Sequence, residues 1–425
     1  MKEAFLHHIW KLQYFNQGAL RTACGKSLSI MSTGSHNHHD GPDFMHATIK
    51  IGEITWVGNI EIHIKSSDWF AHKHQYNPAY NNVILHVVWE NNGRAATTHN
   101  DVALPVFELK DVVEKELINR YEILIGGKDA ILCSTQFTQV PELYIKAMQD
   151  RVLAERLERK SGEVLHLLKQ NNNDWEETAY QLLMKYMGFK VNSSTFLQLA
   201  TILPYRILKK QQYLIQIEAL LYGQAGFLNT TIKDSYHSKL KKEYEYLLAK
   251  YKIANNKIQR SQWRFMRLRP PNFPTIRIAQ VATILYHHKK IFDTLTNAKV
   301  LTQPHSIFQV TTTAYWQKHY DFTKEFHSGT PKIGKTSQEL LFINVVVPLL
   351  VAKANYLDSG SGYAKGLALL MQLRYEDNKI IRKWKALNAP LKYAADSQAF
   401  IELFENYCEE KKCLECTLGN YLLKR

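Results

Sequence analysis

Hydrophobic and polar residues alternate over much of the first hundred positions. Residues 44–51 and 54–65 alternate in the manner of half-buried strands, and Gly52-Glu53 between them has the composition of a tight hairpin turn. Residues 83–89, VILHVVW, form a nearly continuous apolar run, which is typical of a strand buried on both faces. The other elements expected here are two strands and a helix, at residues 28–31, 102–109 and 1–15.

From about residue 110 onward, apolar residues recur at spacings of three and four, which indicates amphipathic helices. The expected helices lie at residues 142–168, 175–187, 208–221 and 239–253. The pattern therefore predicts an α/β module with a mixed sheet at 1–125, followed by a mainly α-helical region at 140–425. A chain of 425 residues is long enough for two or three domains.

A row of ionisable side chains follows one face of the strand expected at 54–65. Glu61, His63 and Lys65 occupy alternate positions and therefore point to the same side, and Asp43 stands just before the preceding strand. Two carboxylates can hold Mg²⁺ or Mn²⁺, because hard cations favour oxygen ligands. A basic group beside an attacking water stabilises developing charge. The pattern predicts a catalytic metal site, and a half-exposed structural strand is the alternative.

The register of the hairpin decides whether these carboxylates meet. With a two-residue loop at Gly52-Glu53, Asp43 lies opposite Ile62 and faces away from Glu61. A slip of one residue reverses the faces, so one extra loop residue or a bulge at Gly58 would set Asp43 opposite Glu61. We expect one of these two arrangements.

The order of elements and this acidic pair resemble the PD-(D/E)XK phosphodiesterase superfamily, in which an Asp opens one strand and an acid, a spacer and a Lys lie on the next. Here Pro42-Asp43 and Glu61 match that motif, while His63 occupies the usual Lys position and Lys65 lies two residues further on. The resemblance implies a restriction-endonuclease-like fold and a nuclease. It also implies Mg²⁺ or Mn²⁺ at Asp43 and Glu61, with His63 or Lys65 assisting the water.

The chain also resembles, over most of its length, an uncharacterised bacterial family known only as a domain of unknown function, which carries no established activity. The residues that carry this resemblance are Gly34, Asn37, Gly41-Pro42-Asp43-Phe44, Gly58-Asn59-Ile60-Glu61-Ile62-His63, Ser67-Asp68-Trp69, His72, His74, Tyr80, Val83-Ile84-Leu85-His86-Val87-Val88, Arg269-Pro270-Pro271-Asn272-Phe273-Pro274 and the C-terminal cysteines.

Histidines are concentrated in the first module, where eleven of the eighteen fall within residues 1–100. A His-x-His pair together with Glu61 could bind Zn²⁺, Mn²⁺ or Fe²⁺ in a hydrolase or oxygenase site. Structural roles are the alternative for each of them. The histidines considered are His36, His38, His39, His63, His72, His74 and His86, of which His72, His74 and His86 are the additional metal-ligand candidates.

Three cysteines lie close together near the C-terminus, and their spacing is C-x4-C-x2-C: Cys408, Cys413 and Cys416. Iron–sulfur clusters use this spacing, and zinc can be held by the same thiolates. The fourth ligand must come from upstream, from Cys24, Cys133 or a histidine. Some nucleases of the superfamily named above carry a comparable cluster with one cysteine before the nuclease core, a layout that Cys24 would match. Buried, unligated cysteines are the alternative.

The chain carries a net charge of +15, and the stretch 239–269 contributes +8 of it, with ten Lys or Arg against two acids. The end of this stretch alternates cations with aromatic rings, which suits a phosphate backbone and stacking on unpaired bases. The alternative is a solvated helix face with the rings in the core. The candidate nucleic-acid contacts are Arg260, Arg264, Arg267, Arg269 and Trp263.

These observations favour a cytoplasmic, metal-dependent nuclease that acts on DNA or RNA. The N-terminus lacks a signal-peptide pattern, and the most apolar stretch, 340–352, is shorter than a membrane span and contains Asn344 and Pro348. No membrane partner is therefore expected. Two other functions remain open. One is a nucleic-acid-binding protein with a degenerate nuclease fold, and the other is a histidine-rich metallohydrolase that acts on a small molecule.

Overall fold

The computed structural model describes the whole chain except residues 38, 94, 231, 254–255, 299–306, 328 and 359–360. His38 thus lies outside the described residues. The chain divides into two compact units, Met1–Met148 with Leu403–Arg425, and Gln149–Glu402. The first unit contains the predicted sheet module, and the second is mainly helical. The C-terminal segment belongs to the first unit, whereas the sequence pattern placed it in the helical region.

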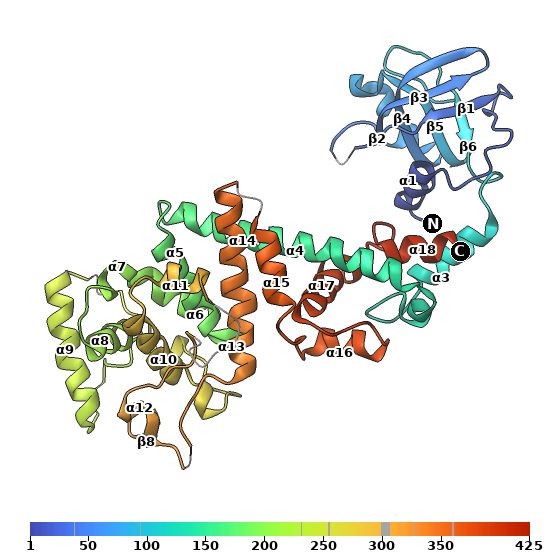
Figure 1. Cartoon of the computed structure of the whole chain (residues 1–425). Coiled ribbons are helices and arrows are strands. Elements are labelled where there is room, and N and C mark those ends of the chain that lie inside the picture. Colours follow the sequence, from blue (N-terminus) through green and yellow to red (C-terminus); the bar gives the residue numbers. More distant parts are fainter. Residues whose placement is uncertain are drawn as a thin grey trace. The chain divides into compact units, whose positions relative to one another are not determined.

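The first unit is built on a six-stranded mixed sheet, seen in blue and cyan in Figure 1. Its main path runs β1-β3-β4-β5-β6, and β2 pairs with the end of β3. Strands β1, β3 and β4 are antiparallel, whereas β4, β5 and β6 are parallel. The strands are β1 (Leu28–Ser32), β2 (Ser35–His36), β3 (Phe44–Ile51), β4 (Ile54–Lys65), β5 (Val83–Glu90) and β6 (Val106–Glu108).

The two long strands of the hairpin, β3 and β4, are confirmed with the predicted bounds, and the turn between them is the short one. Ile51 pairs with Ile54, and Gly52 adopts φ +59°, a left-handed conformation that glycine adopts at little cost. The register changes further along, between Ala47 and Phe44. The extra residue therefore lies in β3, where His46 has φ +58°.

The bulge decides which residue of β4 lies opposite Asp43, and the sequence pattern did not predict its position. Ala47 pairs with Gly58, but Phe44 pairs with Ile60, which sets Asp43 beside Glu61. The predicted longer loop is wrong, and the bulge lies in β3 rather than at Gly58. Gly58 has a different role, because a Cβ there would lie 2.4 Å from Ile84 in β5.

Helical segments complete the first unit. Helix α1 buries Phe5, Ile9 and Trp10, and Phe5 stacks on Tyr121 of α3 with ring centroids 3.8 Å apart. The crossover from β4 to β5 is held by a small core that includes Trp69. These segments are α1 (Glu3–Leu12), α2 (Asp68–Ala71), η1 (His74–Tyr76), η2 (Pro78–Tyr80), α3 (Lys115–Ile125), η3 (Ser134–Gln139), η7 (Phe404–Cys408) and α18 (Thr417–Lys424), where η marks a 3₁₀ or π turn.

The long helix α4 (Glu142–Gln170) begins in the first unit and continues into the second. The second unit contains α5 (Trp175–Met187), α6 (Phe189–Ile202), α7 (Tyr205–Leu208), α8 (Leu214–Gln224), α9 (Ser235–Tyr251), η4 (Arg260–Gln262), η5 (Pro270–Asn272), α10 (Pro274–His287), α11 (Ile291–Thr296), α12 (Ala314–Lys318), β7 (His319–Asp321), β8 (Lys324–Glu325), α13 (Lys335–Leu341), η6 (Phe342–Val346), α14 (Val347–Tyr356), α15 (Ser361–Leu370), α16 (Lys379–Ala386) and α17 (Ala394–Leu403).

The helix expected at 208–221 is divided in two, because α7 ends at Leu208 and α8 begins at Leu214. The intervening residues, KKQQY, are polar and include no apolar position that could face the core. The helical segment Lys335–Tyr356 is long and apolar enough to cross a membrane by length and composition. However, 67% of its most apolar window is buried inside the protein, which is equally expected of a core helix.

Candidate metal centre

Ionisable side chains from the sheet and from the segments around it meet at one site. The carboxylates come from neighbouring strands, with Asp43 just before β3 and Glu61 within β4. Imidazoles come from β4, from β5 and from the crossover between them. They belong to His63, His72, His74 and His86. The site therefore depends on the sheet register and on the packing of the crossover.

The two carboxylates are tied to each other's backbone. The Asp43 N–H donates to Glu61 Oε2 at 3.1 Å, and the Ile62 N–H donates to Asp43 Oδ2 at 2.9 Å. Glu61 is only 5% exposed, whereas the Asp43 side chain is 22% exposed. The pair is thus rigidly placed, and Asp43 lies on its solvent side.

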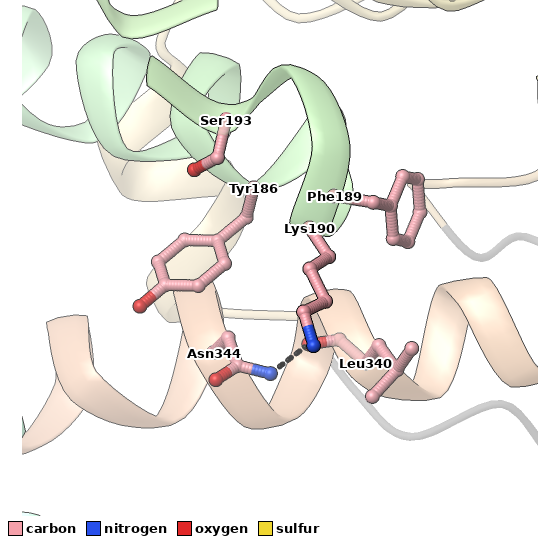
Figure 2. Close-up of a pocket in the computed structure, with 6 residues that line it drawn as sticks. All are labelled: Tyr186, Phe189, Lys190, Ser193, Leu340 and Asn344. Carbon is pink, nitrogen blue, oxygen red and sulfur yellow. Dashed lines mark hydrogen bonds between the residues drawn. The ribbon is translucent and has the colours of Figure 1, made fainter. Parts of the chain in front are cut away.

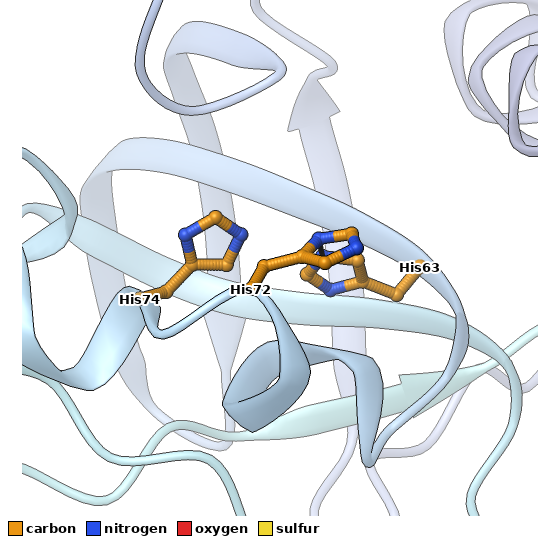
Figure 3. A group of neighbouring side chains, drawn as sticks. All are labelled: His63, His72 and His74. Atoms are coloured by element: carbon orange, nitrogen blue, oxygen red, sulfur yellow. Dashed lines mark hydrogen bonds between the residues drawn. The ribbon is translucent and has the colours of Figure 1, made fainter.

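Three imidazoles gather next to Glu61, and Figure 3 shows them together over the sheet. One ring nitrogen from each of His63, His72 and His74 lies within 4.8 Å of the others. Glu61 Oε1 is 3.2 Å from His74 Nε2 and 3.5 Å from His63 Nε2. His63 and His74 are largely buried, and His72 is exposed, so the group opens to solvent on the side of His72.

His86 lies behind His63, on the next strand. Its Nε2 is 2.9 Å from His63 Nδ1, so one of the two rings donates to the other. The tautomer in which His63 donates through Nδ1 leaves a lone pair on His63 Nε2, which faces Glu61 and accepts a hydrogen bond from His72 Nδ1 at 3.1 Å. A hydrogen bond from the remote ring nitrogen orients metal-ligating histidines in this way.

Burial shifts the protonation equilibria of the site strongly. Burial, reinforced by the negative charge of Asp43, raises the pKa of Glu61 to about 9. Burial and the neighbouring imidazoles lower the pKa of His63 to about 2, and burial lowers that of His86 to about 3. At neutral pH the two histidines are therefore neutral, with lone pairs available. Glu61 holds a proton that a bound cation would displace.

Among the imidazoles of His63, His72, His74 and His86, two buried nitrogen atoms have no hydrogen-bond partner in the described part of the chain: His74 Nε2 and His86 Nδ1. His74 Nε2 lies close to Glu61 but without hydrogen-bond geometry. A buried polar atom without a partner costs free energy, and a ligand at the site would remove that cost at His74. Imidazole nitrogens with one or two carboxylate oxygens form the donor set that Zn²⁺, Mn²⁺ and Fe²⁺ prefer, so the residues present fit a divalent transition metal.

The structure adds two residues that sequence reasoning missed, both from α1. His7 Nε2 is 3.3 Å from Asp43 Oδ2. Burial lowers the pKa of His7, but the hydrogen bond and charge of Asp43 outweigh it, so the pKa is raised. Burial and the charge of Asp43 also raise the pKa of Glu3. The concentration of histidines near the N-terminus was the available signal, but it could not show that α1 faces the sheet at this point.

Lys65, predicted as a possible substitute for the catalytic Lys, does not join the group. It is exposed at the end of β4 and pairs in register with Glu90 of β5. Because each residue advances a strand by about 3.3 Å, Lys65 lies further along β4 than His63 and past the histidines of the crossover. His63 is therefore the basic side chain that the strand brings to the carboxylates.

The basic stretch divides into a buried and an exposed part. Trp263 is 4% exposed, and its Nε1 donates to the carbonyl of Ala225 at 2.8 Å. The prediction that it stacks on nucleic-acid bases is therefore wrong, because its ring packs in the core against Phe196 and Phe227. Arg260 donates to Asp321 at 2.6 Å and is partly engaged within the unit.

The remaining arginines of the stretch, Arg264, Arg267 and Arg269, are exposed. They lie on irregular segments between α9 and α10, where η4 and η5 are single turns. Their side chains are thus accessible to solvent.

The five cysteines differ in burial. Cys24 is exposed, and its Sγ lies 3.2 Å from the hydroxyl of Thr22. Cys133 and Cys416 are buried, whereas Cys408 and Cys413 are half-buried. The ligand set predicted for the three C-terminal cysteines, with Cys24 or Cys133 as its fourth member, stays a prediction.

A separate cleft lies in the helical unit, between α5–α6 and the α13–η6 segment (Figure 2). Its volume is about 370 Å³. The residues that line it are Tyr186, Phe189, Lys190, Ser193, Leu340 and Asn344. None of the predicted site residues lines this cleft. The side chain of Asn344 donates to the carbonyl of Leu340 at 2.9 Å, at the π-helical turn η6.

The protein thus combines a mixed α/β module, which carries a carboxylate–histidine cluster, with a mainly helical unit. The chain belongs to the family described as protein of unknown function DUF2851, whose model matches residues 3–379. No curated protein and no solved structure matches it. The expected membership of an uncharacterised family is confirmed, and the match spans residues of both units.

Proposed function

We propose that this protein is a metal-dependent phosphodiesterase that acts on nucleic acid. The observation that carries the proposal is the bulge in β3, which places Asp43 beside Glu61, with His63 two residues further along the same strand face. A backbone irregularity that re-aims a side chain toward a buried carboxylate is typical of a functional site.

The strand order supports the comparison with PD-(D/E)XK enzymes. Three antiparallel strands lead, through a crossover, to a strand parallel to the third. Of the acidic pair, Asp43 directly precedes the second of these strands and Glu61 lies within the third. The departure from the motif is His63. Its low pKa keeps it neutral, so it would act as a metal ligand rather than as the fixed positive charge of a Lys.

Asp43, Glu61, His63 and His74 would hold the cation, with His72 on the solvent side. A divalent cation bound there would neutralise phosphate charge and activate a water. The Ile62 N–H orients Asp43, and His86 orients His63, so the ligands are held in place before substrate arrives. Glu61 must release its proton as the cation binds, so binding is coupled to pH.

The charge distribution favours a polyanionic substrate. The chain has a net charge of +15, and Arg264, Arg267 and Arg269 are exposed in the helical unit. Arginine side chains contact the phosphate backbone independently of sequence. On this proposal the sheet module carries the chemistry, and the helical unit contributes to binding.

Incubation of the full chain with labelled single-stranded, duplex and branched DNA and RNA tests the proposal. Cleavage should require Mg²⁺, Mn²⁺ or Zn²⁺ and stop on chelation. Asp43→Asn and Glu61→Gln keep an oxygen acceptor for the backbone N–H groups, so they should fold and bind but not cleave. Glu53→Gln, an exposed carboxylate in the turn of the same hairpin, is the matched control and should cleave normally.

Two results would contradict this function. If none of the substrates is cleaved in the presence of Mg²⁺, Mn²⁺ or Zn²⁺, the protein is not a metal-dependent nuclease. Salt-sensitive binding that is unchanged by Glu61→Gln, without cleavage, would instead identify a nucleic-acid-binding protein with a degenerate site.

One observation favours a second candidate, a metallohydrolase that acts on small phosphate esters. Three imidazole nitrogens within 4.8 Å are more than a Mg²⁺ site needs and suit tightly bound zinc. Stoichiometric zinc that is lost in His72→Ala and His74→Ala but kept in His99→Ala, an exposed control, would support this candidate. Turnover of bis(p-nitrophenyl) phosphate without nucleic-acid cleavage would select it over the nuclease.

A further inference from the structure

A buried arginine of the helical unit lacks an acidic partner in the part of the chain that the structure describes. Arg277 lies in the first turn of α10 and is 3% exposed. It donates to Gln280 Oε1 at 2.9 Å and to Asn272 Oδ1 at 2.7 Å, so both hydrogen-bond partners are neutral amides. Its Nε is buried and has no hydrogen-bond partner among the described residues. The guanidinium thus keeps N–H donors that its two partners leave unused.

The lack of an acidic partner has a cost, which a second buried arginine of the same unit avoids. Arg156 is 7% exposed, and its Nη1 forms an ion pair with Glu402 at 2.8 Å. A buried charge without a partner is destabilising, because it has lost the water that would solvate it. Burial lowers the pKa of Arg277 to about 10, so its side chain is still a cation at neutral pH. A bound anion would supply the missing partner.

Arg277 forms part of the wall of a cavity of about 130 Å³. The cavity lies where the end of α5 and the start of α6 meet η5, α10 and α13. Asn272 of η5 and Ser337 of α13 add an amide and a hydroxyl to the wall. The residues that line it, all of them described, include no acid. The cavity therefore offers hydrogen-bond donors and a positive charge without a competing carboxylate.

The aromatic ring of Phe189 lies against the guanidinium. Cζ of Arg277 is 4.6 Å from the ring centroid, within the range of a cation–π contact. Phe189 has φ +48°, a left-handed conformation that is unusual for a bulky residue. It follows Gly188, where a Cβ would lie 2.5 Å from the Asn192 carbonyl oxygen. Backbone in such a conformation persists where the surrounding structure requires it, and it is concentrated at binding and active sites.

The segment before α10 brings Asn272 to the cavity. This segment is residues 269–274, RPPNFP. The Asn272 N–H donates to the Arg269 carbonyl at 2.8 Å in the single turn η5, and Pro274 is the first residue of α10. The N-terminus of a helix carries a partial positive charge. The start of this 14-residue helix therefore adds to the charge of Arg277 in favouring an anion.

We propose that the cavity binds one phosphate group, which Arg277, Asn272 and Ser337 hold. Arg277 contributes its charge and the N–H groups that Gln280 and Asn272 leave unused. Asn272 accepts through Oδ1 and keeps the donors of its amide nitrogen, and the Ser337 hydroxyl donates from another element. Guanidinium groups match phosphate in both charge and geometry. A tetrahedral phosphate presents oxygens in more directions than a planar carboxylate, as donors on three elements require.

Two sources can supply this phosphate group, namely a small phosphorylated molecule and the end of a nucleic-acid strand. Both present the same chemistry to the three side chains. The cavity belongs to the helical unit, whereas the carboxylate–histidine centre belongs to the first unit. The phosphate site therefore does not depend on the proposed nuclease function.

Titration calorimetry of the full chain in the presence of a chelator tests the proposal, with inorganic phosphate as the probe. The chelator removes any cation from the carboxylate–histidine centre, where phosphate would otherwise bind as well. The expected result is one phosphate per chain, with acetate binding at least about tenfold more weakly because it leaves some of the donors unpaired. Asp43→Asn should bind phosphate normally, which separates this site from the first.

Asn272→Asp is the sharpest variant, because it replaces one atom and places a carboxylate beside Arg277. It should keep or raise the melting temperature and weaken phosphate binding by about 10- to 100-fold, since the new carboxylate takes the place of the anion. An arginine with a purely structural role would give the first effect without any phosphate binding to lose. Asn229→Asp, at an exposed asparagine of the same unit, is the matched control and should bind phosphate normally.

Arg277→Gln should also lose phosphate binding, and a measurement on the unmodified chain covers the case in which this variant fails to fold. In the native protein, phosphate should slow hydrogen exchange of the backbone amides at 187–192 and 272–277. It should leave exchange in β3 and β4 unchanged. Protection of β3 and β4 alone would place the phosphate at the first site and contradict the proposal.

Two further probes distinguish the sources of the phosphate group. Competition by glycerol phosphate would support a small phosphorylated molecule. Tighter binding of an oligonucleotide with a terminal phosphate than of the same strand with a terminal hydroxyl, lost in Asn272→Asp, would support a strand end. Absence of phosphate binding would overturn the proposal. So would acetate binding as tight as that of phosphate, or unchanged phosphate binding in Asn272→Asp.

Discussion

Each of the two units buries a glutamate, and the two glutamates have different neighbours. Glu218 of α8 is fully buried, and it accepts hydrogen bonds from the hydroxyl groups of Tyr236 and Thr313. Burial raises its pKa to about 7. Glu61 of β4 is nearly as buried, but it faces a second carboxylate and the imidazoles of His63 and His74.

The difference shows that burial alone does not identify a site. Both carboxylates have raised pKa values, so a search for perturbed groups would select both. Glu218 is surrounded by donors that satisfy it, which is the expected pattern for a structural carboxylate. Glu61 accepts one hydrogen bond, from the Asp43 N–H, and its other close neighbours are imidazole nitrogens that could share a cation with it.

The largest contrast is expected in activity. Glu61→Gln should reduce metal-dependent cleavage by about a thousandfold, because the substitution removes a charged ligand at the reacting centre. Glu218→Gln should leave kcat/KM unchanged. Steady-state kinetics on one labelled substrate measures both. Equal losses in the two variants would remove the distinction drawn between the two glutamates.

The basic stretch offers a second contrast, between a buried ring and an exposed cation. Trp263→Ala should lower the free energy of unfolding by about 3–5 kcal/mol, because it opens a cavity in the core and removes a hydrogen bond. Arg267→Gln should change stability by less than about 0.5 kcal/mol. It should instead lower the slope of log binding constant against log salt concentration by about one, because one phosphate contact is lost. Denaturant titrations and binding at several salt concentrations separate the two effects.

The pH dependence of stability isolates Glu218. Its folded pKa of about 7 exceeds the ordinary 4.5, so the folded state binds more protons than the unfolded state between these values. The contribution of Glu218 to stability is therefore fully retained below about pH 4.5, falls as the pH rises to about 7 and then levels off, with a total loss of about 3 kcal/mol. Glu61, with its pKa of about 9, extends the fall in stability to higher pH. Glu218→Gln should flatten this part of the profile. An unchanged slope in that variant would assign the titration to another group.

The role of His86 in orienting the candidate ligand His63 can be tested directly, because His86 contacts His63 but not the carboxylates. His86→Ala should weaken metal affinity by about 10- to 100-fold, because His63 loses the partner that orients it. His99→Ala, at an exposed histidine, is the matched control. Calorimetric titration with Zn²⁺ or Mn²⁺ measures the affinity. If affinity is unchanged in His86→Ala, the two rings do not act as a pair.

The smallest effect concerns the bulge itself. His46 is exposed and has φ +58°, so substitutions there act mainly through the backbone. His46→Val should cost about 1–2 kcal/mol, since a β-branched residue is strained in this conformation, whereas His46→Gly should be neutral or slightly stabilising. Thermal unfolding and metal titration of both variants test the prediction. Similar stability of the two would show that the left-handed conformation is not required.

Local patterns were sufficient for much of the fold. Strands β3 and β4, the turn at Gly52 and helix α5 match the predicted bounds, because alternation, turn chemistry and helical periodicity act within a few residues. The short strand β2 was missed, since it depends on pairing with β3. The break before α8 was also missed, although the polar residues 209–213 mark it locally. Trp263 illustrates the same limit, because the local sequence of an aromatic residue among arginines does not show whether its ring faces solvent or the core.

The sequence by itself determined that Glu61, His63 and Lys65 share one strand face and that thiols are concentrated near the C-terminus. Only the tertiary structure decided that Asp43 joins Glu61, because this depends on one extra residue in β3. It also decided that His7 of α1 lies 3.3 Å from Asp43. Side-chain alternation is a local property of the chain, whereas register shifts and contacts between distant segments are set by the free energy of the whole folded unit.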